Sequence, residues 1–128
     1  GTTFVPTGQG EGFRGLPADE SSPSRFLRVL ANVTFATPSA DRQAALLDTI
    51  RILHGFDLVP GTVMESTPAG PAPLLTMWST VADLTGGAYL YNTIADPVWY
   101  SIDLASTDFS SSRSVPLAKG GAFTPLTI

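Results

Sequence analysis

The hydrophobic pattern of the chain changes once along its length, and this change limits the possible folds more than any other feature. Apolar residues recur at intervals of three and four through the first half, which is the spacing of one face of an α-helix. In the second half they form strand-like runs rich in β-branched and aromatic residues. The order of the two patterns predicts an α+β fold in which two helices are followed by antiparallel strands.

Prolines separate the two halves of the chain. Four of them fall in residues 56–73, which we interpret as a connection without helix or strand. The turn residues 83–87 are expected to join two strands as a hairpin, and Asp96-Pro97 to break the chain before a third. The final segment, 105–128, is rich in serine and glycine and is expected to be an extended tail. The three strands are expected at residues 74–82, 88–94 and 98–104.

The composition excludes several classes of function. With 128 residues, of which 43% are hydrophobic and 14% charged, the chain 1–128 is expected to form a single piece. A net charge of −4 with only seven basic residues leaves no basic stripe for phosphates, so we expect no nucleic-acid partner. The absence of cysteine and the single histidine argue against a metal site, and we expect no metal and no cofactor. No apolar run approaches the roughly 18 residues of a membrane span.

The loop that enters the first helix contains the clearest candidate for a functional residue. Ser22 can act as the N-cap and Pro23 suits the first helical position, which places Arg25 in the first turn. The helix dipole disfavours a cation there, so an arginine at this position suggests a site. Arg28 is its neighbour on the helix surface. From residue types alone, two solvated arginines on an exposed face are the simpler interpretation.

Each predicted helix has an apolar face and recognisable ends. The second helix is expected to have Ser39 as its N-cap and Asp41 in its first turn, and to end at Gly55. His54, in its last turn, is either a general base or a cation favoured by the C-terminal dipole. We favour the second interpretation, because no nucleophile is near it in sequence. The apolar faces comprise Phe26, Leu27, Leu30 and Val33 in the first helix and Leu46, Leu47, Ile50 and Leu53 in the second.

Aromatic residues in the predicted strands allow two interpretations. Trp78, Tyr89, Tyr91 and Trp99 could form a ligand box, or they could belong to a core. Aromatic side chains in strands are more often buried, so we favour the core. The strands are apolar on both faces, as expected of a sheet with helices on one side and another sheet on the other.

Three segments of the chain resemble patterns of a known family. The GLPGD…SxxRFxR pattern of the choloylglycine hydrolases is similar to Gly15-Leu16-Pro17-Ala18-Asp19 followed by Ser22-Pro23-Ser24-Arg25-Phe26-Leu27-Arg28, with Ala18 in place of the usual glycine. The T-x-x-x-D-x-x-x-x-x-Y-Y/F-Y hairpin of the same family resembles residues 78–91. Its N-P-x-x-x-x-V-D-L strand resembles residues 96–104, with Asp96 in place of asparagine. The family includes bile salt hydrolases and penicillin V acylases, which are N-terminal nucleophile (Ntn) hydrolases.

The resemblance implies an αββα Ntn-hydrolase sandwich, of which this chain is the C-terminal part and which another chain completes. It implies an acylase-type amidohydrolase that cleaves a linear N-acyl amide. The nucleophile, expected to be a cysteine, would be N-terminal on a second polypeptide released from the same precursor by autoproteolytic processing. Of the catalytic positions of the family, Arg25 is the one with a counterpart here. It is expected beside the nucleophile, where a guanidinium lowers the pKa of a thiol. No residue is assigned to substrate binding.

Two other interpretations remain open. The chain could be a non-catalytic binding or assembly protein that keeps the Ntn scaffold, or a free-standing α+β domain that carries the motif by chance. Under the leading interpretation the partners are the second polypeptide and a small-molecule acyl amide, with a higher homo-oligomer of this heterodimer as an option. The compartment is left open, since secretion or periplasmic export would depend on a signal peptide in an upstream segment.

Overall fold

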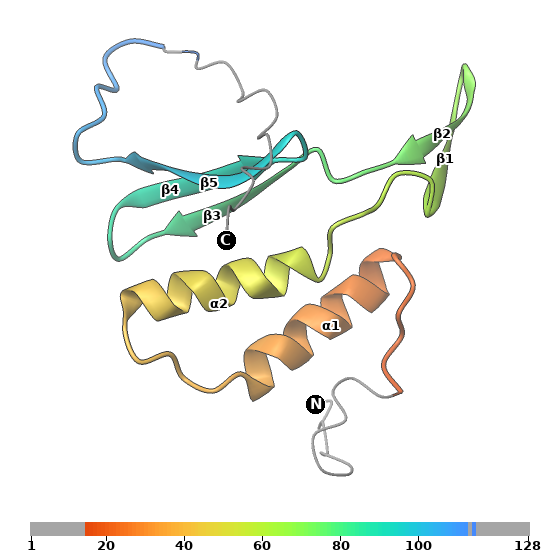
Figure 1. Cartoon of the computed structure of the whole chain (residues 1–128), viewed down its shortest axis with the longest axis horizontal. Coiled ribbons are helices and arrows are strands. Elements are labelled where there is room, and N and C mark those ends of the chain that lie inside the picture. Colours follow the sequence, from red (N-terminus) through yellow and green to blue (C-terminus); the bar gives the residue numbers. More distant parts are fainter. Residues whose placement is uncertain (1–14, 113, 115–128) are drawn as a thin grey trace, which may run out of the picture. The chain divides into compact units, whose positions relative to one another are not determined.

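The computed structural model describes residues 15–112 and 114. Within these residues the chain forms two helices followed by five strands, as Figure 1 shows. The chain divides into two compact units, a helical unit up to Phe56 and a strand unit from Asp57. The predicted order of helices and antiparallel strands is confirmed. The elements are α1 (Ser22–Phe35), α2 (Arg42–His54), β1 (Val63–Thr67), β2 (Gly70–Leu74), β3 (Trp78–Asp83), β4 (Ala88–Thr93) and β5 (Asp96–Asp103).

The N-terminus of α1 is built differently from the prediction. Ser22 is the first helical residue, and the N-cap is Ser21, whose side chain makes no capping hydrogen bond. Pro23 therefore occupies the second helical position, where its missing N–H has no intrahelical partner to lose. The side chain that bonds to this end of the helix is the carboxylate of Asp19.

The N-cap of α2 is Asp41, so the prediction of Ser39 is wrong. The Asp41 carboxylate accepts a hydrogen bond from the Ala44 N–H at 2.8 Å, which satisfies one of the free donors of the first turn. Ser39 lies too far before the helix to do this, and its hydroxyl donates instead to Asp48 Oδ2 at 2.9 Å. Gly55 is the C-cap, as predicted.

The buried side of α1 is shifted from the predicted apolar face. Leu27 and Leu30 are half-buried, but Phe26 and Val33 are 64% and 65% exposed. The most buried residue of the helix is Ala31, at 1% exposed. Hydrogen bonds to the preceding loop turn Ser24 and Arg28 inward, and these polar residues take up part of the buried side.

A hairpin occupies the proline-rich segment that was predicted to lack secondary structure. Strands β1 and β2 pair antiparallel, with Thr67 opposite Gly70 next to the turn. Pro71 and Pro73 are opposite Ser66 and Met64. They lie two residues apart, and alternate pairs of an antiparallel ladder exchange no hydrogen bonds. Both prolines can therefore sit in the strand without breaking the ladder, since each lacks only an N–H that points away from the partner.

The remaining strands form one three-stranded antiparallel sheet in the order β3-β4-β5. The predicted hairpin is confirmed, with Trp78 opposite Thr93 and Asp83 opposite Ala88. The turn before β5 lies at residues 94–95, so Asp96 and Pro97 begin the strand instead of breaking the chain. Of the segment 105–128, residues 105–112 contain neither helix nor strand, and residues 113 and 115–128 lie outside the described part.

The two faces of this sheet differ in burial. Side chains on one face are buried, among them Val81 of β3 and Asn92 of β4. On the opposite face Trp78 is 57% exposed and Tyr89 is 38% exposed. The prediction that the strand aromatics form a core therefore fails for Trp78 and Tyr89 in the described chain. Tyr91 is half-buried and stacks on Tyr100 of the neighbouring strand, with ring centroids 5.5 Å apart.

Candidate active site

Arg25 projects from the start of α1. Its backbone N–H donates to the Ser21 carbonyl at 3.0 Å, which is the first hydrogen bond of the helix. The side chain is half-buried, and its guanidinium carbon lies 5.7 Å from the centroid of the Phe56 ring. Among residues 15–112, no side-chain hydrogen bond or ion pair occupies the Arg25 guanidinium. Within this part of the chain, no carboxylate therefore neutralises its charge.

The loop before Arg25 is attached to the first helical turn by three hydrogen bonds around Asp19. The Asp19 carboxylate accepts from the Ser21 N–H at 2.9 Å and from the Ser24 hydroxyl at 2.7 Å. The Ser21 hydroxyl in turn donates to the Ser24 hydroxyl at 3.0 Å. The hydroxyls of Ser21 and Ser24, with the Ser21 N–H, stabilise the carboxylate and lower the pKa of Asp19 to about 2. Asp19 is therefore ionised across the physiological range.

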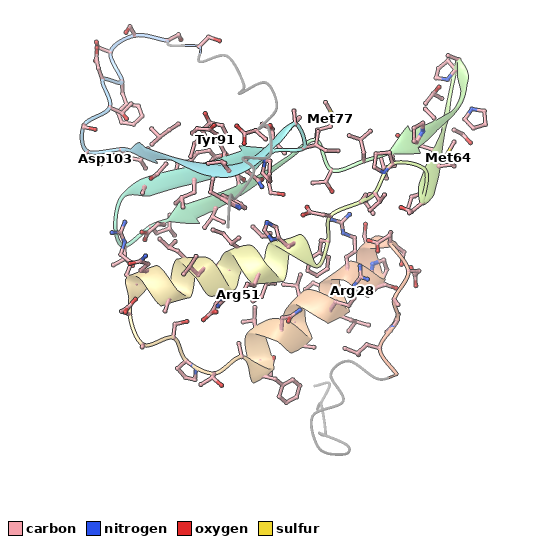
Figure 2. The ribbon with its side chains drawn as sticks, in the orientation of Figure 1. Arg28, Arg51, Met64, Met77, Tyr91 and Asp103 are labelled. Carbon is pink, nitrogen blue, oxygen red and sulfur yellow. The ribbon has the colours of Figure 1, made fainter. Side chains whose placement is uncertain are left out.

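Arg28 is a structural residue, and the interpretation of it as solvated is wrong. Its guanidinium donates to the Ala18 carbonyl and to Glu20 Oε2, both at 3.1 Å, and its side chain is only 14% exposed. The guanidinium carbon lies 5.0 Å from the centroid of the Phe56 ring. Figure 2 shows Arg28 near the N-terminal end of α1. The second arginine thus holds the loop against the helix.

Phe56 connects the two arginines. It follows the C-cap of α2, donates its N–H to the Leu53 carbonyl at 2.9 Å, and is 8% exposed. Both guanidinium groups lie within the roughly 6 Å at which a cation is attracted to an aromatic face. Arg28 is also held by hydrogen bonds to the loop, whereas among the described residues the contact found for the Arg25 side chain is the one with the Phe56 ring.

The backbone of the loop explains both the match to the family pattern and the departure from it. Gly15 has a φ of +84°, a conformation that side chains other than glycine rarely adopt. Within the described residues, positive φ occurs only at glycine, so Ala18 stands where no left-handed conformation is needed. The substitution of alanine for the usual glycine is therefore tolerated, and the Ala18 carbonyl keeps its bond to Arg28.

Sequence reasoning found Arg25 but missed the residues that surround it. The sequence identifies Asp19 only as part of the family motif, and it predicts that Phe56 belongs to a connection without helix or strand. The usable signal was the spacing of Asp19, Ser21 and Ser24, since short polar side chains next to a helix start commonly bond to local backbone and to one another. The contact with Phe56 could not be read from the sequence, because it depends on how α1 and α2 pack.

Two other clusters of polar residues lie in the described part of the chain. A hollow of about 420 Å³ lies between α1 and α2, but its charged residues, Asp48 and Arg51, pair with each other at 2.6 Å. Figure 2 shows Arg51 on α2. At the start of β5, Asp96 is 6% exposed and accepts the Tyr100 hydroxyl at 2.6 Å and the Val98 N–H at 3.0 Å. In each cluster the charged groups already have partners, so neither is as strong a candidate as the Arg25 region.

The described residues 15–112 and 114 include no group of three or more metal-binding side chains placed to hold a metal ion. In that same part of the chain, neither helix has the length and apolar character that crossing a membrane requires. His54 lies in the last turn of α2, which is the position predicted for it.

The loop, the arginine and the order of helices and strands together define a family. The model of the linear amide C–N hydrolases, choloylglycine hydrolase family, matches residues 1–116 of this chain. The chain belongs to this family, as the sequence motifs predicted.

The similar proteins of known name include bile salt and conjugated bile acid hydrolases. The chain is 30% identical over 112 residues to the bile salt hydrolase/transferase of Bifidobacterium longum. The aligned residues cover 88% of this chain and 34% of that protein. It also resembles two crystal structures of variants of the conjugated bile acid hydrolase of Clostridium perfringens. One has a TM-score of 0.69 at 24% identity and covers 98% of this chain and 38% of the solved chain. The other has a TM-score of 0.68 at 26% identity, and the match covers 96% of this chain and 37% of the solved chain.

The chain thus spans about one third of the curated relatives that it matches. Its two helices and antiparallel strands correspond to part of a larger Ntn-hydrolase fold. The predicted fold class is confirmed at this level.

Proposed function

We propose that this chain is part of an amidohydrolase that cleaves a linear N-acyl amide, and that a partner polypeptide from the same precursor supplies the nucleophile. The family match supports the reaction class. None of the 128 residues is a cysteine, so a cysteine nucleophile would have to lie outside this sequence. The observation that carries the proposal is the half-buried Arg25 guanidinium, which lies on the family motif and has no anionic partner among the described residues.

In this proposal Arg25 faces the nucleophile of the partner. A guanidinium near a thiol stabilises the thiolate, which is the reactive form, and lowers its pKa. The α-amine of an N-terminal nucleophile can act as its own base. Preorganised hydrogen-bond donors stabilise the oxyanion of the tetrahedral intermediate. Of these parts this chain supplies the arginine.

The exposed face of the three-stranded sheet supports the presence of a partner. Trp78, Tyr89, Tyr100 and Ile102 are each at least 36% exposed and lie on the same face of the sheet. Large apolar side chains gathered on one surface mark an interaction site. A sheet that stacks on another sheet buries such residues at the interface.

The substrate class follows from the named relatives. Because the relatives from Bifidobacterium and Clostridium are named as bile salt and conjugated bile acid hydrolases, a conjugated bile acid is the first substrate to assay. Penicillin V-like side-chain amides, N-acyl homoserine lactones and other fatty acyl amides are the further candidates from the family resemblance. All contain a linear amide between an acyl group and an amine.

Substitution of the two arginines tests the proposal. In the assembled complex, Arg25→Ala should lower kcat/KM for the cleaved amide by about a hundredfold or more, since it removes the charge that stabilises the thiolate. Arg28→Ala should lower it much less, because Arg28 bonds to Ala18 and Glu20 and acts on the loop. Amide hydrolysis measured by release of the free amine gives both values, with complex assembly checked by size-exclusion chromatography.

Three outcomes are informative. A large loss with Arg25→Ala in an assembled complex supports the assignment of Arg25. Equal and small losses for both variants would contradict it. A complex that assembles but hydrolyses none of the candidate amides would favour a non-catalytic assembly protein.

A further inference from the structure

We propose that Asp19 is a positioning residue that keeps Arg25 in place and leaves it unpaired. This inference rests on the proposed function and concerns the same site. Asp19 lies in the loop before α1, and its carboxylate joins the loop to the helix through the Ser21 N–H and the Ser24 hydroxyl. Arg25 follows Ser24 directly, so the network fixes the residue from which the guanidinium projects.

Because Ser24 is buried, its hydroxyl depends on the hydrogen bond to Asp19. Ser24 is only 5% exposed, so its hydroxyl has little access to water and depends on protein partners. It donates to Asp19 at 2.7 Å and accepts from the Ser21 hydroxyl at 3.0 Å. Hydrogen bonds to an ionised acceptor are the shorter and stronger class. If Asp19 were lost, the Ser24 hydroxyl would need another acceptor, and the first turn of α1 would shift with it.

The same network governs the electrostatics of Arg25. Among the described loop residues 15–21, Asp19 and Glu20 are the acidic ones, and either could neutralise a nearby arginine. Asp19 is instead occupied by serine groups, and Glu20 is paired with Arg28 at 3.1 Å. Both carboxylates have other partners, and the charge of Arg25 stays available for the nucleophile. In this proposal the loop therefore fixes the backbone from which Arg25 projects and keeps its own carboxylates paired elsewhere.

The experiment compares Asp19→Asn and Ser24→Ala with a matched control in the assembled complex. The control is Asp48→Asn on α2, because Asp48 also accepts a serine hydroxyl, from Ser39 at 2.9 Å, and an arginine, Arg51 at 2.6 Å. Asp19→Asn and Ser24→Ala should each lower kcat by about tenfold to a hundredfold, since a displacement of about 1 Å at a catalytic group has effects of this size. KM should change less, and Asp48→Asn should retain the parental kcat.

Two readouts separate positioning from general structure. A displaced guanidinium stabilises the thiolate less, so the acidic limb of the kcat/KM profile, and of alkylation of the nucleophile by iodoacetamide, should move to higher pH in Asp19→Asn. If Asp19 acts through Arg25, Asp19→Asn should cause no further loss in an Arg25→Ala background. A structural defect would instead lower activity without moving the limb and would add to the loss caused by Arg25→Ala.

The outcomes distinguish this inference from the proposed function. If Arg25→Ala is inactive but Asp19→Asn and Ser24→Ala match Asp48→Asn, the positioning role is overturned and the function stands. If the losses caused by Asp19→Asn and Arg25→Ala were additive in the double variant, the positioning role would also be overturned. If Arg25→Ala is fully active, the catalytic role of Arg25 itself is wrong. Ser24→Ala removes one hydroxyl and no charge, so it provides the same test if Asp19→Asn does not assemble.

Discussion

Arg25 and Arg28 lie three residues apart on one helix but have different surroundings. Arg28 reaches back to the loop, where Ala18 and Glu20 receive its hydrogen bonds, and it becomes part of the structure. Arg25 has an aromatic contact with Phe56 and no anionic partner among the described residues. An ion pair that is satisfied within the fold stabilises it, whereas a half-buried charge without a counterion carries a desolvation cost that a bound anion would offset. Arg25 therefore has the properties of a functional residue.

A second residue-scale prediction concerns the pair of Asp96 and Tyr100. The hydrogen bond from the Tyr100 hydroxyl lowers the pKa of Asp96, and the same bond, with burial and the carboxylate charge, raises the pKa of Tyr100 above 10.0. The pair therefore stabilises the fold above the unfolded pKa of aspartate, about 3.9, and below that of tyrosine, about 10. The contribution falls as pH drops through the folded pKa of Asp96 or rises through that of Tyr100.

Phenolate absorbance titration of the assembled protein measures this effect. The difference between the parent and Tyr100→Phe isolates Tyr100, whose midpoint should lie above the ordinary value for tyrosine. In Asp96→Asn the midpoint should move down toward that value, since the charged acceptor is gone. If the Tyr100 midpoint were identical in the parent and in Asp96→Asn, the hydrogen bond would not control the pKa of Tyr100.

Among the secondary-structure elements, α2 shows how one side chain decides where a helix begins. Ser39 and Asp41 both belong to the residue types that cap helices, and the sequence favoured the first. The choice depends on reach, because a cap must bond to the N–H two or three residues later. Asp41 meets this condition with Ala44, while Ser39 bonds along the helix to Asp48.

Removal of the cap should weaken the start of α2. Asp41→Ala should lower the free energy of unfolding of this end of the helix by about 1 kcal/mol, as is typical when a capping side chain is lost. Hydrogen exchange in the assembled protein should show faster exchange of the Ala44 amide. Ser39→Ala, the matched variant, should leave that amide unchanged. Faster exchange in Ser39→Ala than in Asp41→Ala would reverse the assignment of the cap.

Across the whole chain, sequence patterns that act over a few residues predict the helices and one hairpin, whereas contacts between distant residues are not predicted. Both helices and the hairpin around Asp83–Gly87 follow from hydrophobic period and turn residues, which act over a few positions. The hairpin of β1 and β2 does not follow from the sequence, because prolines such as Pro71 and Pro73 predict breaks, whereas register decides whether a proline interrupts a ladder. The motif identified Arg25, but the contact with Phe56 depends on packing, which periodicity does not encode.

The exposure of one face of the three-stranded sheet also depends on packing that the sequence pattern does not encode. Trp78 was predicted to be in a core, and in the described chain it is 57% exposed. The prediction rested on residue type, which indicates a preference for burial and not the partner that provides it. The chain spans about one third of the length of its curated relatives, so it corresponds to part of their fold. We propose that the partner covers this face of the sheet.

The most direct test of the account is denaturing mass spectrometry of the natively purified protein, with N-terminal sequencing of every polypeptide found. We predict a second polypeptide that begins with cysteine, and labelling of that cysteine by iodoacetamide should abolish amide hydrolysis. A second polypeptide that begins with another residue would exclude the cysteine nucleophile. A single, stable 13.4 kDa species without a partner would contradict the account of this chain as part of a larger amidohydrolase.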